Sequence, residues 1–176
     1  MNYAAIKYKD IANGTGVRTV LFVSGCTHHC EGCFQPQTWD FAYGEPFTEE
    51  IKEEVLRSIE PSYVAGLTLL GGEPMEPDNQ RALLSLVREF DERFPKKDLW
   101  VYSGYTFETD ILAEDGAGHC EVTRELLSHT DIIVDGEFVL AEKDITLRFR
   151  GSRNQRIIDV RRSMESGATA LSELSA

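Results

Sequence analysis

Three cysteines, Cys26, Cys30 and Cys33, lie within one eight-residue stretch and are the clearest sign of chemistry in the chain. In a reducing compartment this spacing indicates metal or redox chemistry more than a disulfide framework. Three thiolates suit a four-iron cluster in which the protein holds three irons and the fourth iron is left open. We therefore predict that these cysteines are the ligands of a redox-active 4Fe-4S cluster.

The cysteines are also compatible with two alternatives to a cluster. A structural zinc ion with His28 or His29 as its fourth ligand uses the same donor types, because zinc sites with three cysteines and one histidine are common. In the second alternative, all three thiols are unbound and buried. Cys120 lies far from the others and has no recognisable ligand spacing, so we expect it to be a bystander.

Composition limits the size of the fold and the kind of partner. The 176 residues, 41% of them hydrophobic, suffice for one compact core but not for two full-sized domains. We expect a single domain over residues 1–162 and a flexible tail, rich in serine and alanine, over 163–176. A net charge of -12 repels phosphate backbones and anionic lipids, so we expect neither nucleic acid nor membrane as a partner. No apolar run reaches the length of a signal peptide or a membrane span, which predicts a cytoplasmic protein.

Strand and helix patterns alternate along the chain. Four short apolar runs predict buried strands, at residues 18–23, 66–70, 99–102 and 131–134. One predicted helix follows Thr48, which can cap it, a second is capped by Asp78, and a weaker one covers 121–127. Strands that alternate with helices pair in parallel through right-handed crossovers. The predicted fold class is α/β, as a partial (incomplete) parallel β/α barrel.

Each of the four predicted strands ends in a loop that contains glycine. The loops begin with Gly25-Cys26, Gly71-Gly72-Glu73-Pro74, Ser103-Gly104-Tyr105 and Asp135-Gly136. Ligands of such sheets bind beyond the carboxyl ends of the strands. One glycine loop is ordinary, but four at one edge, with the cysteines in one of them, predict a ligand site there.

The cysteine loop after the first strand, with Gly71-Gly72-Glu73-Pro74 after the second, resembles the radical S-adenosylmethionine superfamily. This resemblance implies a partial barrel of the radical S-adenosylmethionine type. It also implies that S-adenosylmethionine binds the open iron through the amino and carboxylate groups of its methionine end. The residue before the third cysteine is often aromatic in that superfamily, whereas this chain has Gly32 there and Phe34 just after, which points to a subgroup.

Motifs along nearly the whole chain, to about Val160, resemble the activating proteins of anaerobic ribonucleoside-triphosphate reductases. They are Asp10-Ile11, Asn13-Gly14 with Gly16, Phe22-Val23-Ser24-Gly25-Cys26, Gly32-Cys33-Phe34, Thr38-Trp39, Pro46-Phe47-Thr48, Val134-Asp135-Gly136 and Arg150-Gly151-Ser152 with Asn154-Gln155. This resemblance implies an activase that reductively cleaves S-adenosylmethionine at the cluster. The resulting 5'-deoxyadenosyl radical would generate a glycyl radical near the C-terminus of the reductase's large subunit. The implied partners are that large subunit and an electron donor such as reduced flavodoxin.

Two further functions remain open. One is a radical S-adenosylmethionine enzyme that acts on another glycyl-radical enzyme or on a small molecule. The other is a zinc-binding module without catalysis. The length of the chain favours a protein substrate, because a short, incomplete barrel leaves one side open to a partner's peptide loop.

The resemblance also implies which residues contact the cofactor. It places Gly32, Cys33 and Phe34 against the cofactor, although Phe34 is equally expected as a core residue. Gly72 has no Cβ, so its backbone can approach the methionine end closely. Glu73 is expected either to accept a hydrogen bond from the cofactor's ammonium group or to be a solvated loop residue. Strand-end position alone adds two candidate ligands of the ribose hydroxyls, Ser103 and Asp135.

A basic stretch stands out in this acidic chain and contains Arg148, Arg150, Arg153, Arg156, Arg161 and Arg162. We expect these arginines on a terminal hairpin with strands at 146–150 and 156–160, where they balance local charge. The alternative is a docking site for an acidic partner or for a cofactor carboxylate.

Overall fold

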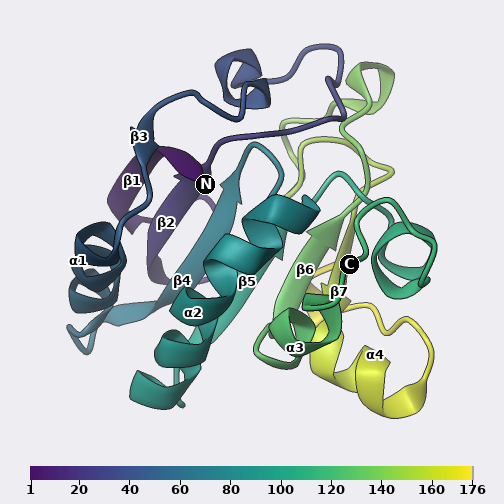
Figure 1. Cartoon of the computed structure of the whole chain (residues 1–176). Coiled ribbons are helices and arrows are strands. Elements are labelled where there is room, and N and C mark those ends of the chain that lie inside the picture. The colour runs from purple at the N-terminus through teal and green to yellow at the C-terminus, as the bar shows by residue number, and fades with distance from the viewer. Residues whose placement is uncertain (176) are drawn as a thin grey trace.

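One open sheet forms the framework of the protein, and the computed structural model describes residues 1–175 of the chain (Figure 1). The seven strands follow the order β3-β1-β2-β4-β5-β6-β7 across the sheet. The strands are β1 (Asn2–Asp10), β2 (Val17–Val23), β3 (Glu45–Pro46), β4 (Val64–Gly71), β5 (Asp98–Tyr102), β6 (Ile132–Asp135) and β7 (Arg156–Asp159). The helices are α1 (Glu49–Ile59), α2 (Pro77–Arg93), α3 (Thr123–Ser128) and α4 (Val160–Ser166). Shorter turns are η1 (Pro36–Trp39), the π-helical η2 (Phe107–Leu112), η3 (Leu140–Glu142) and η4 (Glu173–Ser175).

Parallel pairing forms the centre of the sheet, as the alternation of strands and helices predicts. β2 pairs with β4, β4 with β5, and β5 with β6, all in parallel. The loops that follow these four strands therefore gather at one end of the sheet, the top in Figure 1. The predicted α/β class is confirmed. The sheet is not closed, and nothing in its order conflicts with an incomplete barrel.

The edges of the sheet differ from our expectation of parallel strands alone. β1 pairs antiparallel with β2, β3 with β1, and β7 with β6. The expected terminal hairpin is wrong, because residues 146–150 form no strand and β7 pairs with β6 instead. Pairing with β6 buries Ile157 and Ile158 on the two faces of the sheet, which an exposed hairpin would leave in water.

Local signals set the start of the two longest helices. Thr48 caps α1 as predicted, because its Oγ1 accepts a hydrogen bond from a backbone N–H in the first turn at 3.4 Å. Val55 and Ile59 on the apolar face of α1 are buried. Asp78 is not the cap of α2, which already begins at Pro77. A proline fits this position because the first N–H groups of a helix have no partner within the helix.

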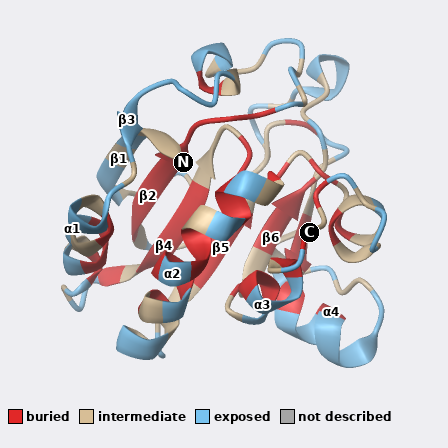
Figure 2. Ribbon diagram, viewed as in Figure 1, coloured by how far each residue is buried: buried red, intermediate tan, exposed pale blue. Residues whose placement is uncertain are grey.

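Side chains alternate between two faces of the sheet, and each face has its own core. Figure 2 shows that the central strands are largely buried. Leu69 and Val101 point toward the helices and belong to the larger core, to which all four α-helices contribute buried residues. Trp100 and Val134 point to the opposite face, here called the inner face, and form a smaller core with Ile157 of β7. Phe149 from the loop between β6 and β7 covers part of the inner face, with its ring centroid 5.3 Å from that of Trp100.

The C-terminal residues return to the sheet. The domain boundary that we expected at residue 162 lies inside α4, which ends at Ser166 and is capped by Gly167 with a positive φ of 69°. Leu171 forms a β-bridge with Ile158, and the Ser175 hydroxyl donates to the carbonyl of Ile157 at 2.7 Å. The mobility of residues 163–176 stays a prediction. Within residues 1–175, no helix combines the length and apolar character that crossing a membrane requires.

A buried arginine joins the amino-terminal ends of the central strands. Arg18 of β2 is 0% exposed, and burial lowers the pKa of its guanidinium more than the nearby carboxylate of Asp98 raises it. Its guanidinium donates to Asp98 Oδ1 at 2.6 Å, to Thr68 Oγ1 at 2.8 Å and to the carbonyl of Leu67 at 2.8 Å. These bonds link β2 to β4 and β5 at the end of the sheet opposite the cysteines.

We expect Arg18→Met to lower the free energy of unfolding by about 3 kcal/mol, because it leaves a carboxylate and a buried carbonyl without their donor. Urea unfolding of the purified variant measures the change. Arg93→Met is the matched control, because Arg93 forms only exposed ion pairs with Glu53 and Glu89, and we expect its unfolding curve to overlay that of the wild type. Equal unfolding midpoints for Arg18→Met and the wild type would refute this role for Arg18.

Candidate metal and cofactor site

The cysteine loop is fixed to the sheet at its beginning. The backbone N–H of Gly25 donates to Thr38 O at 2.8 Å, and that of Cys26 donates to Trp39 O at 3.2 Å, so η1 closes the loop. At the other end of the loop, Cys33 N donates to Cys30 O at 3.2 Å in a tight turn. Gly32 takes a φ of 77° in this turn, a conformation that favours glycine.

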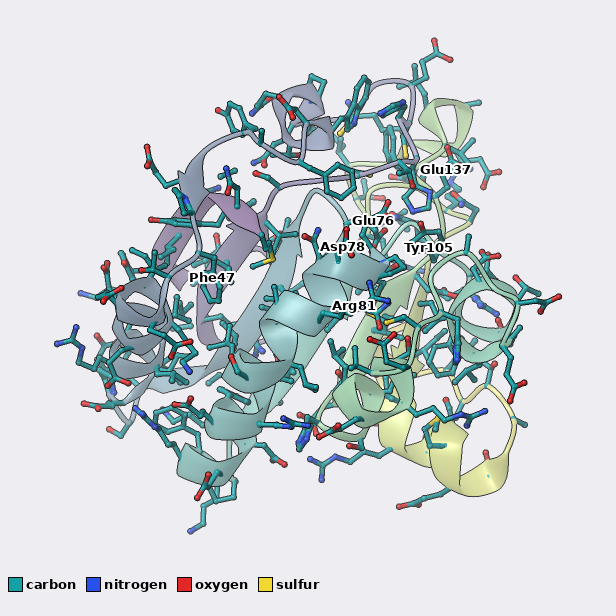
Figure 3. The ribbon with its side chains drawn as sticks, viewed as in Figure 1. Phe47, Glu76, Asp78, Arg81, Tyr105 and Glu137 are labelled. Atoms are coloured by element: carbon teal, nitrogen blue, oxygen red, sulfur yellow. The ribbon has the colours of Figure 1, made fainter. Side chains whose placement is uncertain are left out.

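The loop between β4 and α2 holds the cysteine loop from the other side. Gly72 N donates to Val23 O and Glu73 N to Gly25 O, both at 2.8 Å. The carboxylate of Glu76 accepts from Thr27 N at 2.8 Å and from its hydroxyl at 2.5 Å. Glu76 and Tyr105 lie close together beside the start of α2 (Figure 3), and both reach Thr27. The Gly-Gly-Glu-Pro loop therefore positions the residues around Cys26.

Glu73 connects three of the loops at strand ends. Its side chain is 1% exposed, so the expectation of a solvated loop residue is wrong. One carboxylate oxygen accepts from Met75 N at 2.8 Å, and the other accepts from Gly104 N at 2.6 Å and lies 3.0 Å from His28 Nε2. Burial lowers the pKa of His28, but the hydrogen bond to Glu73 and the charges of Glu73, Glu137 and Glu76 together raise it above its ordinary value. The Glu73 carboxylate thus ties the cysteine loop to the loop after β5.

A cavity opens between these loops, and we call it the cluster cavity. About 160 Å³ of free space lies among its walls, which include Cys26, Cys30, Cys33, Gly72, Glu73 and Ser103. The structure therefore brings together the three candidate metal ligands and three of the candidate cofactor contacts.

The thiols differ in their surroundings. Cys26 is buried, and burial raises the pKa of its thiol to about 12. Burial also raises the pKa of Cys30, which is partly exposed like Cys33. The alternative of three buried core thiols is therefore wrong. A protonated Cys26 thiol is a poor nucleophile, so its environment disfavours a reactive free thiol.

The two histidines that we considered as a fourth zinc ligand both have other partners. Within residues 1–175, no three His, Cys, Asp or Glu side chains converge closely enough to hold one metal ion. A zinc site requires such convergence, because every ligand lies about 2.0–2.3 Å from the same ion. His28 bonds Glu73, and His29 packs on Trp39 at a ring distance of 4.7 Å. A four-iron cluster differs from a zinc ion in that it binds each thiolate at a different iron.

Gly72 permits a close contact inside the protein. A Cβ at this position would lie 2.6 Å from Gly25 O and 3.0 Å from Thr38 O. We expected the missing side chain to make room for the cofactor and a substitution to leave the cysteine loop untouched. The contact shows that a side chain on Gly72 would first displace the backbone beside Cys26.

Phe34 and Gly32 lie outside the cluster cavity. The Phe34 ring is 77% exposed, so the expectation of a core residue is wrong. It lies 6.3 Å from the Phe138 ring and 5.2 Å from Lys143 Nζ, and it lines an adjoining cavity. Gly32 packs toward Leu140, whose Cδ1 would lie 2.9 Å from an added Cβ. Both residues flank Cys33 without lining the cluster cavity.

Ser103 and Asp135 have different surroundings. Ser103 lines the cluster cavity, and its hydroxyl oxygen accepts from Tyr105 N at 3.1 Å, which leaves the hydroxyl proton to donate. Asp135 does not line the cavity and is 1% exposed. Its carboxylate accepts from Phe107 N at 2.9 Å and from Arg156 Nε at 3.0 Å. The structure therefore makes Asp135 a buried ion-pair partner, whereas Gly136 beside it lines the cavity.

Sequence reasoning missed several residues that shape the site. Thr27 and Glu76 had no motif to mark them, and their contact spans 49 positions of the chain. Tyr102 and Gln155 line the cluster cavity from β5 and from the loop before β7. One signal in the sequence could have marked Tyr102 as a residue of the site, namely its position at the end of a predicted strand, next to Ser103.

We expect Gly72→Val to lower the iron and sulfide content of anaerobically reconstituted protein, because the new side chain displaces the backbone next to Cys26. Gly167→Ala is the matched control. Gly167 has a positive φ of 69°, a conformation that favours glycine, but no atom lies within 4 Å of an added Cβ. This control should lose about 1 kcal/mol of stability and keep its iron. Full iron content in a folded Gly72→Val variant would contradict the assignment.

Comparison with known proteins agrees with this geometry. A family model described as a 4Fe-4S single cluster domain matches residues 12–158. The anaerobic ribonucleoside-triphosphate reductase-activating protein of Pasteurella multocida (strain Pm70) is 42% identical over 159 residues, which cover 89% of this chain and 96% of the relative. The protein of the same name from Enterobacteria phage T4 is 41% identical, with 89% and 93% covered, and that from Escherichia coli (strain K12) is 37% identical, with 92% and 100% covered. The chain therefore belongs to the family of anaerobic ribonucleoside-triphosphate reductase-activating proteins and contains a 4Fe-4S single cluster domain.

Proposed function

We propose that the protein is a radical S-adenosylmethionine oxidoreductase that activates a glycyl-radical enzyme. In this proposal it reductively cleaves S-adenosylmethionine and uses the 5'-deoxyadenosyl radical to generate a glycyl radical on the large subunit of anaerobic ribonucleoside-triphosphate reductase. The observation that carries the proposal is one cavity whose walls hold Cys26, Cys30 and Cys33 beside the Gly72-Glu73 backbone. The names of the relatives support the reductase as the partner.

The residues of this chain bind and orient, whereas the cofactors supply the reactivity. When bound, the reduced cluster supplies the electron that breaks a sulfur–carbon bond of S-adenosylmethionine. Cys26, Cys30 and Cys33 would hold the cluster at the wall of the cluster cavity. Glu73 already uses both carboxylate oxygens within the protein, so we assign it the role of holding His28 and Gly104 in place.

The cavity walls divide the remaining cofactor contacts. The Ser103 hydroxyl has a proton free to donate toward a ribose oxygen, and Gly136 offers its backbone on the same wall. Trp39 and Phe138 add apolar surface that excludes water around the reacting atoms. Gly32 and Phe34 flank Cys33 and act in this proposal through the position of that ligand.

The proposal also includes the supply of electrons and the place of action. Reductive cleavage needs a strong reductant, for which an electron donor such as reduced flavodoxin is suitable. A cytoplasmic location fits three free thiols that must stay reduced to bind iron.

Single substitutions of Cys26, Cys30 and Cys33 by alanine should each abolish cofactor cleavage and bleach the brown colour of the anaerobic protein. Cys120→Ala should retain both, because Cys120 packs beside Thr123 and does not line the cluster cavity. Iron, sulfide and zinc analysis, with chromatography of the cleavage products, measures these effects. One tightly held zinc in a colourless wild-type protein would rule out the cluster, and equal losses in all four variants would show that the ligands are misassigned.

Mixed anaerobically with the reductase's large subunit, S-adenosylmethionine and a strong reductant, the protein should produce a persistent doublet in the electron paramagnetic resonance spectrum of the partner. The doublet arises because a glycyl radical couples to its remaining α-hydrogen. Omission of the large subunit is the control. Cofactor cleavage without a radical on the reductase would reject this substrate and favour another glycyl-radical enzyme or a small molecule.

A further inference from the structure

The turn before β7 contains a motif that the proposed function leaves without a role. Its residues are Arg150-Gly151-Ser152 and Asn154-Gln155. Two side-chain amides of this turn bond the loop after β6. Asn154 Nδ2 donates to Glu137 O at 2.7 Å. Gln155 Nε2 donates to Gly136 O at 3.0 Å. Gly136 lines the cluster cavity and Glu137 does not, so the two bonds hold different parts of the loop.

The side-chain amide of Gln155 is held in one orientation. Its Oε1 accepts hydrogen bonds from Gly151 N at 2.8 Å and from Ser152 N at 3.2 Å. An amide oxygen can accept these bonds and an amide nitrogen cannot, so the nitrogen is the atom that faces Gly136 O. The backbone of Gln155 is bonded as well. Its N–H donates to Ser152 O at 3.2 Å, and its carbonyl accepts from Arg150 Nη1 at 3.1 Å. Gln155 is therefore a donor in a fixed position.

Gly136 needs such a donor because its backbone has unusual freedom. It has a φ of 100°, and a glycine samples more backbone conformations than any other residue. Space is not the reason for a glycine here, since no atom would lie closer than 3.7 Å to an added Cβ. The N–H of Gly136 donates to Tyr105 O at 3.2 Å, in the loop after β5. The bond from Gln155 holds the carbonyl, so both polar groups of Gly136 are fixed.

The bond between Gln155 and Gly136 joins two residues of one cavity wall. Both residues line the cluster cavity, as does Ser103. The shape of this wall therefore depends on where the bond holds the Gly136 backbone. Within residues 1–175, Gln155 makes none of its hydrogen bonds to the cysteine loop. A change at Gln155 should therefore alter the wall and leave the metal ligands in place.

We propose that Gln155 is a positioning residue, whose side-chain amide holds the Gly136 backbone on the wall of the cluster cavity and thereby sets the affinity for S-adenosylmethionine. The identity of this cofactor rests on the proposed function. Gln155 acts through Gly136 and needs no contact of its own with the cofactor. The motif of residues 150–155 then has a role in binding, although it lies more than 100 positions from the cysteines.

Gln155→Glu tests the donor alone. The carboxylate still accepts from Gly151 N and Ser152 N, but it cannot donate to Gly136 O and repels it. We expect about tenfold weaker binding of S-adenosylmethionine, the loss of one hydrogen bond. The added negative charge by itself attracts the sulfonium of the cofactor, so charge does not explain a loss. Titration calorimetry of the reconstituted holoprotein without reductant, in which the cofactor stays intact, measures the affinity.

S-adenosylhomocysteine is the second probe, because it lacks the sulfonium charge and should show the same loss. Asn154→Asp is the matched control. It adds the same charge one position away and removes the same kind of donor from Glu137 O, which lies outside the cavity wall. We expect this control to bind both probes like the wild type. Unchanged affinity in Gln155→Glu, or equal losses in the two variants, would overturn the inference.

Hydrogen exchange and iron content separate positioning from a structural role. Exchange of the peptide that contains Gly136 should be faster in Gln155→Glu than in Asn154→Asp. Iron content and the thermal midpoint should stay near those of the wild type, because the bonds to Gly151 and Ser152 remain. A loss of iron or of cooperative unfolding in Gln155→Glu would make Gln155 a structural residue and overturn the inference. Binding and cleavage of S-adenosylmethionine by the wild type test the proposed function separately, so failure of the inference alone is recognisable.

Discussion

The carboxylate of Glu73 is the point on which the functional end of the molecule depends. A carboxylate removed from water is costly unless hydrogen bonds replace its hydration. Glu73 obtains these bonds from its own loop, from the loop after β5 and from His28 in the cysteine loop. Each of these loops lines the cluster cavity. The need to satisfy one buried group therefore fixes how three separate segments are arranged around a ligand.

Arg18 plays the corresponding part at the other end of the sheet. Apolar contacts between strands and helices are strong but tolerate small shifts, because the hydrophobic effect is not directional. Hydrogen bonds from one buried guanidinium to β4 and β5 are directional, and they are lost when a strand slips by one residue. With Arg18 at one end and Glu73 at the other, the register of the central strands is specified at both ends.

The sequence predicted the features that arise from neighbouring residues and missed those that arise from distant ones. The four central strands and the cysteine spacing are local patterns, and the structure has them where we expected. β1 escaped notice because it is half exposed and polar, without an apolar run. Its place in the sheet depends on pairing with β2, which no local pattern encodes.

The errors at the site have the same origin. Gly72 and Asp135 were both placed correctly at strand ends, but their partners there were not foreseeable. Gly72 accommodates the carbonyl of Gly25, and Asp135 binds Arg156. Phe34 has an apolar side chain, yet it lies on a loop that reaches past the core. Residue type and local pattern indicate what a side chain can do, whereas contacts across tens of residues decide what it does.

The two halves of the cysteine loop differ in how firmly they are held. We expect this difference to set the order in which the three thiols meet an incoming metal. Cys26 is buried, and its backbone N–H donates a hydrogen bond to η1. Cys30 and Cys33 instead lie in a short turn and are partly exposed. Solvent reaches the thiols of Cys30 and Cys33 more readily than that of Cys26, so an incoming iron source would meet the outer two thiols first. The same exposure makes these two thiols the first that an oxidant in solution reaches when no metal covers them. The loop therefore has one accessible side, and both loading and oxidative damage would take place there.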